Sequence, residues 1–327
     1  MDRHEYYDDF EVKNYTNGFD ESYRNPVNLL RPIEFKLTFP ILKIMRKIKN
    51  IVVPTDFSET ARNAFNYAKE FAPRIGATIT VANVKEYLLP TSELAITVNP
   101  LYSEGETMEA FNNFIADGIT NKATQTLKRP IKTQTLGGSP ADSLIELSDN
   151  KETDLIVIGA SGLKDFITRL MGTTSLSVAK NAHCPVLLIP QNTAWQPIKN
   201  IMYACNYFSI SPKMVKEIND FALLVKAKIH FVHIDDVEKK VEKEADELNW
   251  DELFIMTDNK LRFETHYIYG ENKIEELKKY VYKNKIDLMT FVSRKKDFWE
   301  NLFSKSVIQE IAFAGIPKPM LVLHPDD

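Results

Sequence analysis

The chain has 327 residues, of which 44% are hydrophobic and 26% charged, and its formal net charge at pH 7 is −4. This length favours two domains, and the composition favours ordinary globular cores over a disordered chain. The slightly negative charge argues against a nucleic-acid partner, because proteins that bind the phosphate backbone carry a basic excess. No apolar run reaches the roughly 20 residues of a membrane-spanning helix, so no membrane association is expected.

The number and spacing of the cysteines indicate whether the cellular compartment of the protein is reducing or oxidising. Cys184 and Cys205 are the two cysteines of the chain. They form no disulfide framework and no metal-ligand spacing, which is typical of a reducing compartment, and we expect both thiols to lie in the core. The first residues lack the basic and apolar regions of a secretory signal. The sequence therefore predicts a cytoplasmic protein.

Residues 1–44 differ from the remainder of the chain. They are acidic, rich in tyrosine and without an apolar period, which predicts a poorly structured N-terminal extension. A partner-binding or regulatory arm is the functional alternative. It is also open whether translation begins at Met1 or at Met45.

From residue 45 onward, short β-branched runs alternate with amphipathic segments. This alternation predicts right-handed crossovers and an α/β fold with a parallel, doubly wound sheet. In the first copy of the pattern the expected strands are 50–54, 78–84, 131–136, 154–158 and 185–189, and the expected helices are 59–73, 106–128, 140–149 and 173–182.

The pattern then repeats. "KNIVVPTDFS" at 49–58 returns as "KNIMYACNYFS" at 199–209, and "TDLIVIG" at 153–159 returns as "IDLMTFV" at 286–292. The second copy lacks most of a long loop at 85–105. We expect a first domain at 45–190, a linker at 191–197 that ends in a proline, and a second domain at 198–327.

Two motifs of the first copy are expected to meet in space. In a flavodoxin-like, Rossmann-like sheet with strand order 3-2-1-4-5, the first and fourth strands are neighbours, and the winding of the chain reverses between them. "VPTDFS" ends the first strand, and a glycine set begins at the end of the fourth. Both therefore face the crevice at the carboxyl ends of the strands, where ligands bind in such sheets.

The residue types in these motifs suit a nucleotide. Gly159 and Gly162 let the backbone approach a ligand and expose amide groups, and Gly172 removes bulk before the next helix. Hydroxyl residues 173–175 then begin a helix, whose N-terminus favours phosphate. Asp56 can accept hydrogen bonds from an adenine or ribose edge, and Val84 can contact a purine face. The plainer alternative is that the glycines serve turns and a hydroxyl caps the helix; Ser58 is interpreted in that way, as a helix cap outside the site.

The spacing Gly-x2-Gly-x9-Gly followed by a hydroxyl residue resembles the ATP-binding signature of the universal stress protein family. "PTDFSETA" at 54–61 is similar to the opening motif of that family, and 45–324 resembles a tandem pair of its domains. The resemblance implies an adenine nucleotide, ATP or else ADP or AMP, with Mg²⁺ riding on the phosphates and no metal site of the protein's own. It places the base near Pro54, Thr55, Asp56 and Val84, the phosphates near Gly159, Gly162, Gly172, Thr173, Thr174 and Ser175, and Ile158 and Ser161 in the same pocket.

The second copy departs from this pattern. Asn206 stands at the place of the aspartate, and Val292 and Lys295 stand at the places of the first two glycines. A Cβ there would obstruct the backbone approach, so we interpret the second domain as a degenerate copy that buries a shared face. The family pairs its domains through edge strands, so 185–189 and 319–323 are expected to join as a pseudo-dimer. Association of two chains remains open.

The sequence thus predicts a stress-response protein that binds a nucleotide and signals through protein partners the sequence does not identify. No residue near the glycines is an evident base, so at most weak ATP hydrolysis is expected. The six histidines are scattered: His230 and His233 point to opposite faces of one strand, which favours neither a metal site nor a hydrolase triad. The alternatives are a slow ATP-hydrolysing or nucleotide-transferring enzyme, and an interaction scaffold that binds no nucleotide.

Overall fold

The computed structural model describes residues 48–86, 104–117, 130–160, 173–205, 212–235, 263–269, 273–292 and 316–324. All of them belong to one compact unit, Ile44–Asp327. Within these ranges no helix is both long and apolar enough to cross a membrane. The N-terminal extension expected at 1–44 lies outside the described residues.

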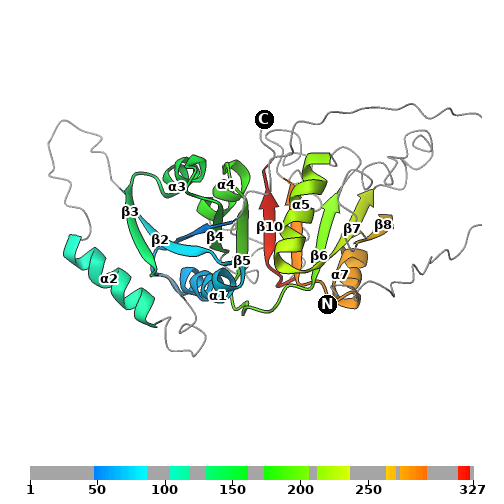
Figure 1. Ribbon diagram of the computed structural model, residues 1–327, viewed down its shortest axis with the longest axis horizontal. Helices are drawn as coiled ribbons and strands as arrows, with labels where there is room; N and C mark the ends of the chain where they lie inside the picture. Colours follow the sequence, from blue (N-terminus) through cyan, green and yellow to red (C-terminus); the bar gives the residue numbers. More distant parts are fainter. Residues whose placement is uncertain are drawn as a thin grey trace, which may run out of the picture. The chain divides into compact units, whose positions relative to one another are not determined.

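The first half of the chain forms five parallel strands. They lie in the order β3-β2-β1-β4-β5 (Figure 1), which confirms the predicted order 3-2-1-4-5. The central strands are apolar and buried because helices cover both faces of the sheet. The strands are β1 (Asn50–Pro54), β2 (Thr78–Lys85), β3 (Lys132–Gly137), β4 (Leu155–Ala160) and β5 (Val186–Pro190).

The second half repeats this arrangement and joins the first. Its strands lie in the order β10-β9-β6-β7-β8, and β10 pairs antiparallel with β5, with Met320 opposite Leu188. One ten-stranded sheet results, and the predicted edge pairing is confirmed. The strands are β6 (Asn200–Cys205), β7 (Lys228–Asp235), β8 (Phe263–Tyr269), β9 (Leu288–Val292) and β10 (Met320–Leu323).

Two apolar clusters pack against the sheet. The larger holds β-strand side chains with residues of α1, α2 and α5, and the smaller holds residues of α3, α4 and α7. Both clusters contain side chains from each half, so the halves share their core. The helices are α1 (Glu59–Ile75), α2 (Glu104–Asp117), α3 (Pro140–Asp149), α4 (Thr173–Asn181), α5 (Pro212–Val225) and α7 (Lys273–Lys283).

Local chemistry sets the ends of α1. The Ser58 hydroxyl accepts a hydrogen bond from the backbone N–H of Ala61 at 3.3 Å, which confirms the predicted cap. Gly76 follows the helix in the left-handed conformation, φ 71°. The helix therefore continues past its predicted end at Pro73 and stops at Ile75.

The same carboxylate contact starts the central strands of both halves. Asp154 Oδ2 accepts hydrogen bonds from the backbone N–H groups of Lys49 and Asn50, at 2.9 and 3.0 Å. In the second half Asp287 Oδ2 accepts from the corresponding groups of residues 199 and 200 at the same two distances. Each aspartate fastens the start of one strand to the start of its neighbour.

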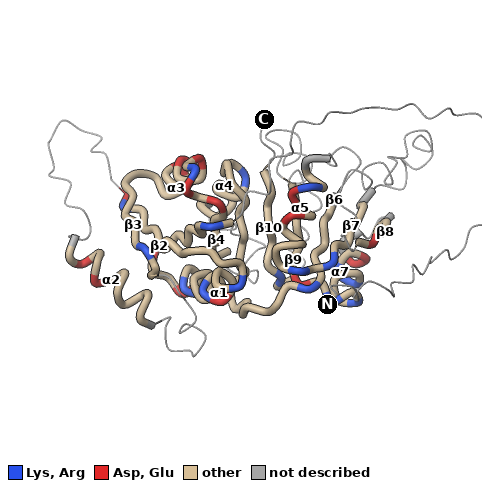
Figure 2. The backbone as a smooth tube through the Cα atoms, in the orientation of Figure 1, with Lys and Arg blue, Asp and Glu red and all other residues tan. Residues whose placement is uncertain are grey.

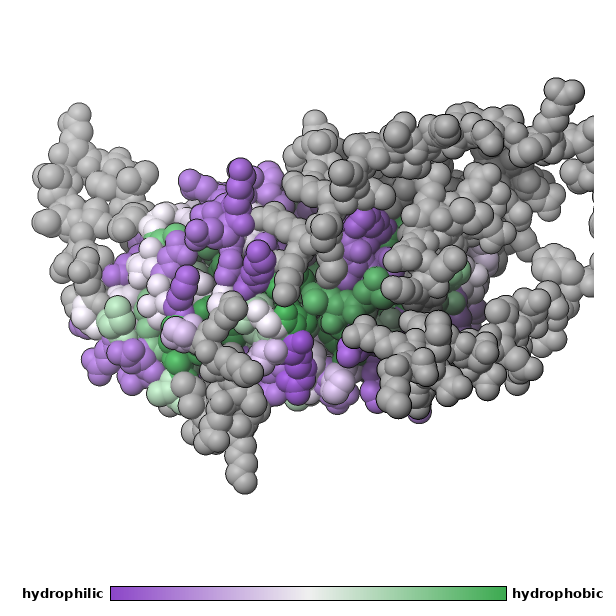
Figure 3. Space-filling view, viewed as in Figure 1, coloured by the Kyte–Doolittle hydropathy of each residue, from purple (hydrophilic) through white to green (hydrophobic). Residues whose placement is uncertain are grey.

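The seam between the halves is apolar. Neither β5 nor β10 carries a charged residue (Figure 2), and hydrophobic residues gather over this part of the visible surface (Figure 3). Trp195, in the segment between the halves, packs against Tyr67 and Phe71 of α1 with ring centroids 5.0 and 5.5 Å apart. Phe71 also contacts Phe221 of α5. Burial of these surfaces holds the halves together.

Candidate functional site

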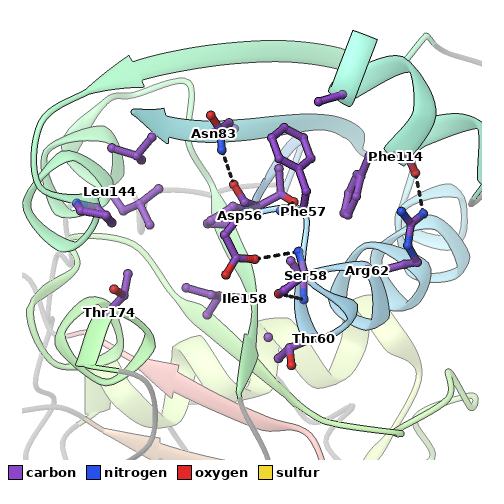
Figure 4. Close-up of a pocket in the computed structure, with 18 of the residues that line it drawn as sticks. Asp56, Phe57, Ser58, Thr60, Arg62, Asn83, Phe114, Leu144, Ile158 and Thr174 are labelled. Carbon is purple, nitrogen blue, oxygen red and sulfur yellow. Dashed lines mark hydrogen bonds between the residues drawn. The ribbon is translucent and has the colours of Figure 1, made fainter. Parts of the chain in front are cut away.

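A cavity of about 910 Å³ opens at the carboxyl ends of β1, β2 and β4. This is the crevice beside the reversal of the sheet's winding, where a ligand is expected. Figure 4 shows its walls: the turn after β1, the end of β2, and the starts of α3 and α4. Eight of the predicted site residues line it: Pro54, Thr55, Asp56, Val84, Ile158, Gly159, Thr174 and Ser175.

Hydrogen bonds fix the turn between β1 and α1. The hydroxyl of Thr55, a buried residue, accepts from the N–H of Phe57 at 2.8 Å. The exposed Asp56 accepts from the N–H of Ser58 at 3.0 Å through one carboxylate oxygen, Oδ1. In Figure 4 its carboxylate points into the cavity, toward the side where Leu144 and Thr174 lie. The turn thus presents a carboxylate to any ligand in the cavity.

The end of β2 forms a second wall. Asn83 donates a hydrogen bond from its side-chain amide to the carbonyl of Thr55, at 2.8 Å, and this bond ties β2 to the turn (Figure 4). Val84 follows and packs against the smaller apolar cluster. Together with Ile158 of β4, Val84 gives the cavity an apolar surface of the kind that a flat ring can cover.

Gly159 lines the cavity, and the structure shows a requirement for glycine at this position that the sequence did not indicate. A Cβ on Gly159 would lie 2.5 Å from the carbonyl oxygen of Thr60, in the first turn of α1. Real Cβ atoms essentially never come that close, so glycine is required by the approach of α1's own backbone. The close approach of the backbone to a ligand, which the sequence suggested, stays a prediction. The glycine serves the packing of α1 on β4.

The start of α4 faces the cavity across from Asp56. Thr174 and the buried Ser175 lie in the first turn of this helix and line the cavity. Free N–H groups and the positive end of the helix dipole make such a turn favourable for an anion. Thr173 begins the helix, and the other predicted residues, Ser161, Gly162 and Gly172, lie outside the described residues.

Sequence reasoning missed a whole wall of the cavity. It is formed by α2 and by the first turns of α1 and α3, which follow the carboxyl ends of their strands. The position of α2 after β2 was the available signal, since a helix that follows a parallel strand starts at the ligand-binding edge. Ser58, which we expected to lie outside the site, lines the cavity as well as capping α1. The missed lining residues are Phe57, Thr60, Ala61, Arg62, Ala82, Asn83, Lys85, Glu86, Thr107, Ala110, Asn113, Phe114, Pro140 and Leu144.

Part of the corresponding edge in the second half can be compared. Leu288 pairs with Ile201 as Leu155 pairs with Ile51, so Val292 occupies the register position of Gly159. Val292 is 1% exposed and belongs to the core. Asn206 and Lys295, which we expected to replace site residues, lie outside the described residues.

The remaining predicted features concern thiols and metals. Cys184 is buried, as predicted, and forms no disulfide bond. Within the described ranges no group of three or more His, Cys, Asp or Glu residues could hold a metal ion.

Known proteins resemble this chain in sequence. The profile of the universal stress protein family matches residues 47–190. A universal stress protein of Methanocaldococcus jannaschii is 36% identical over 146 residues, which are 43% of this chain and 81% of that protein. The family match covers the half of the chain that contains the cavity.

Solved structures resemble it in fold. A universal stress protein from Archaeoglobus fulgidus DSM 4304 has a TM-score of 0.62 and 17% identity, and the match covers 84% of this chain and 98% of that one. Since it spans more than four-fifths of this chain, it includes strands of both halves. A universal stress protein solved in complex with cAMP is 25% identical over 45% of this chain and 99% of that one, with a TM-score of 0.34.

Proposed function

The chain belongs to the universal stress protein family, and on that premise we propose that its first half binds an adenine nucleotide across the carboxyl ends of β1, β2 and β4. The nucleotide is ATP, or ADP or AMP. One observation carries the proposal: Asp56 and the first turn of α4 face each other across a single cavity, although they are far apart in the sequence. Its volume of about 910 Å³ lies within the range of small-molecule sites.

Each part of a nucleotide has a suitable wall. Val84 and Ile158 offer apolar surface to the base, and the Asp56 carboxylate can accept hydrogen bonds from the base or the ribose. Thr174 and Ser175 offer hydroxyls at a helix N-terminus to the phosphates. Pro54, Thr55, Gly159, Ser161, Gly162, Gly172 and Thr173 complete the proposed site.

We propose binding, rather than turnover, as the output. Hydrolysis of a phosphoanhydride needs an aligned water and a base within reach of it. Asp56 already accepts the N–H of Ser58 in the turn, which suits a residue that holds a ligand in place. Mg²⁺ would be carried by the phosphate oxygens, to which it binds well while keeping several waters.

The organisation of the chain is part of the proposal. The first domain, at 45–190, binds the nucleotide, and the second, at 198–327, has architectural or signalling work. The cytoplasm suits this role in a stress response, because Cys184 forms no disulfide bond and adenine nucleotides are the proposed ligands of the protein.

Isothermal titration of ATP, ADP, AMP and cAMP into the full chain tests the proposal. We expect heat of binding with the unaltered chain, weaker binding by Asp56→Asn and none by Gly162→Lys, which places a long side chain in the proposed phosphate cradle. Glu152→Gln, at an exposed position outside the cavity, is the matched control and should bind as the unaltered chain does. Absence of binding by the unaltered chain would contradict the proposal.

A further inference from the structure

The turn that presents Asp56 contains a phenylalanine in an unusual conformation. Phe57 has φ 65°, in the left-handed region that bulky residues rarely adopt. Such a conformation persists only where surrounding contacts hold it.

The ring of Phe57 is held by α2. Its centroid lies 5.5 Å from that of Phe111 and 5.8 Å from that of Phe114, and both pairs are edge-to-face. Phe111 and Phe114 are 2% and 1% exposed. Edge-to-face pairs of buried rings add to the stability that burial alone supplies.

Arg62 of α1 makes a second tie to the same helix. Its Nη1 donates a hydrogen bond to the carbonyl of Phe114 at 3.1 Å, and its guanidinium lies 4.7 Å from the centroid of the Phe114 ring. Figure 4 shows Arg62 reaching from α1 to this residue. The helix α2 is therefore docked on the turn and on the first part of α1.

The other side of the turn carries the polar contacts. The N–H of Phe57 donates to Thr55 Oγ1, and the N–H of Ser58 donates to Asp56 Oδ1, at 2.8 and 3.0 Å. Phe57 donates one of these bonds and directly precedes the donor of the other. Its φ therefore fixes how Asp56 and Ser58, on either side of it, are oriented relative to each other. Figure 4 shows its ring on the side of Phe114 and the Asp56 carboxylate on the opposite side.

We infer that Phe57 is a positioning residue that couples the packing of α2, which also supplies part of the cavity wall, to the direction of Asp56. Docking of α2 on the Phe57 ring stabilises the turn that aims Asp56, and a ligand held by Asp56 stabilises the docking of α2 in return, because coupling between two sites is reciprocal. The stabilisation of α2 docking by a ligand rests on the proposed nucleotide site. The support of the turn by α2 concerns the protein alone.

A variant at Phe111 separates support of the turn through the Phe57 ring from direct contact with a ligand in the cavity. Phe111 is not among the described residues that line the cavity, yet it packs on Phe57. Phe71 is the matched control: it is also a buried phenylalanine of the larger apolar cluster, and it packs on Trp195 at the seam. Phe111→Leu and Phe71→Leu both remove one buried ring and keep an apolar side chain.

The first measurement needs no ligand. Hydrogen exchange at the amides of Phe57 and Ser58 should be faster in Phe111→Leu than in the unaltered chain, because the turn loses its support. Phe71→Leu should leave these two amides unchanged while lowering the melting temperature to a similar extent. Equal exchange in Phe111→Leu and Phe71→Leu would overturn the inference.

The second measurement uses ATP. Phe111→Leu should weaken its binding by roughly tenfold, a common size for coupling between sites, and Phe71→Leu should not. Phe57→Gly, which adopts positive φ without strain, should bind more tightly than Phe57→Ala, since both lack the ring and only alanine is strained. Equal binding by Phe111→Leu and Phe71→Leu would overturn the coupling. A chain that binds no nucleotide would contradict the proposed function, and the exchange result would still decide the support of the turn by α2.

Discussion

The two halves of the sheet share a scaffold but differ at the edge where the cavity lies. In both, an aspartate accepts two backbone N–H groups at the start of the central strand, at matching distances. At the carboxyl ends, Gly159 in the first half meets the backbone of α1, whereas Val292 in the second is a core residue. Building the sheet and building the edge that lines the cavity are thus separate requirements on the sequence.

The second half differs in a further way, near the start of its strands. His230 of β7 is buried, with Nδ1 3.0 Å from the hydroxyl of Tyr280 and 3.5 Å from Glu264, and His266 stacks on Tyr280. In the first half, Thr80 pairs with Lys132 as His230 pairs with Glu264. Burial lowers the pKa of His230 and raises that of Tyr280 to about 12.

The largest effect should come from giving the first half the residue of the second. In Gly159→Val the new Cβ would lie 2.5 Å from the Thr60 carbonyl oxygen, so α1 must shift. Overpacking of this kind costs about 3 kcal/mol of the free energy of unfolding. Urea denaturation measures the loss, and ATP titration should show no binding. A variant as stable as the unaltered chain would show that α1 does not require this glycine.

A smaller and symmetric effect is expected at the two aspartates. Asp154→Ala and Asp287→Ala each leave two backbone N–H groups without their acceptor, at a cost of about 2 kcal/mol. Urea denaturation of both variants, with exposed Glu152→Gln as the control, should give similar losses. A clear difference between the two losses would break the comparison of the scaffolds.

The smallest effect concerns pH. Burial lowers the pKa of His230, and it lowers that of His324 to about 4, where His183 adds a like charge. These histidines therefore bind protons in the unfolded chain at pH values where they stay neutral in the folded chain. The free energy of unfolding consequently decreases as the pH falls below the ordinary histidine pKa of about 6.5.

Denaturation between pH 7 and pH 5.5 measures this loss, and the shift at His324 alone corresponds to roughly 1 kcal/mol. His324→Gln should flatten the profile, although it also alters the hydrogen bond that Nε2 donates to the carbonyl of Ala179. The exposed Lys151→Gln is the control and should keep the slope of the unaltered chain. An unchanged slope in His324→Gln would refute this assignment.

Much of the scaffold was predictable because it follows from local pattern. The predicted helix 140–149 has the bounds of α3, and the strand order follows from the alternation of elements and the repeat. The end of α1 lies beyond the prediction, at Ile75, since the αL residue Gly76 stops the helix and Pro73 does not.

The contacts that dock α2 at the cavity could not be predicted in this way. Phe57 and Phe111 are 54 residues apart along the chain, and only packing brings their rings together. The reason for Gly159 was also hidden, because the approach of Thr60 is a contact between elements. The residue types indicated which positions line the cavity, whereas the structural reasons for Phe57 and Gly159 lie in tertiary contacts.

The most direct test of the account is the number of nucleotides bound per chain. Native mass spectrometry of the full chain with saturating ATP should show one bound ATP, which is lost in Gly162→Lys and kept in Glu152→Gln. No bound ATP, or two that resist Gly162→Lys, would contradict a nucleotide site confined to the first half.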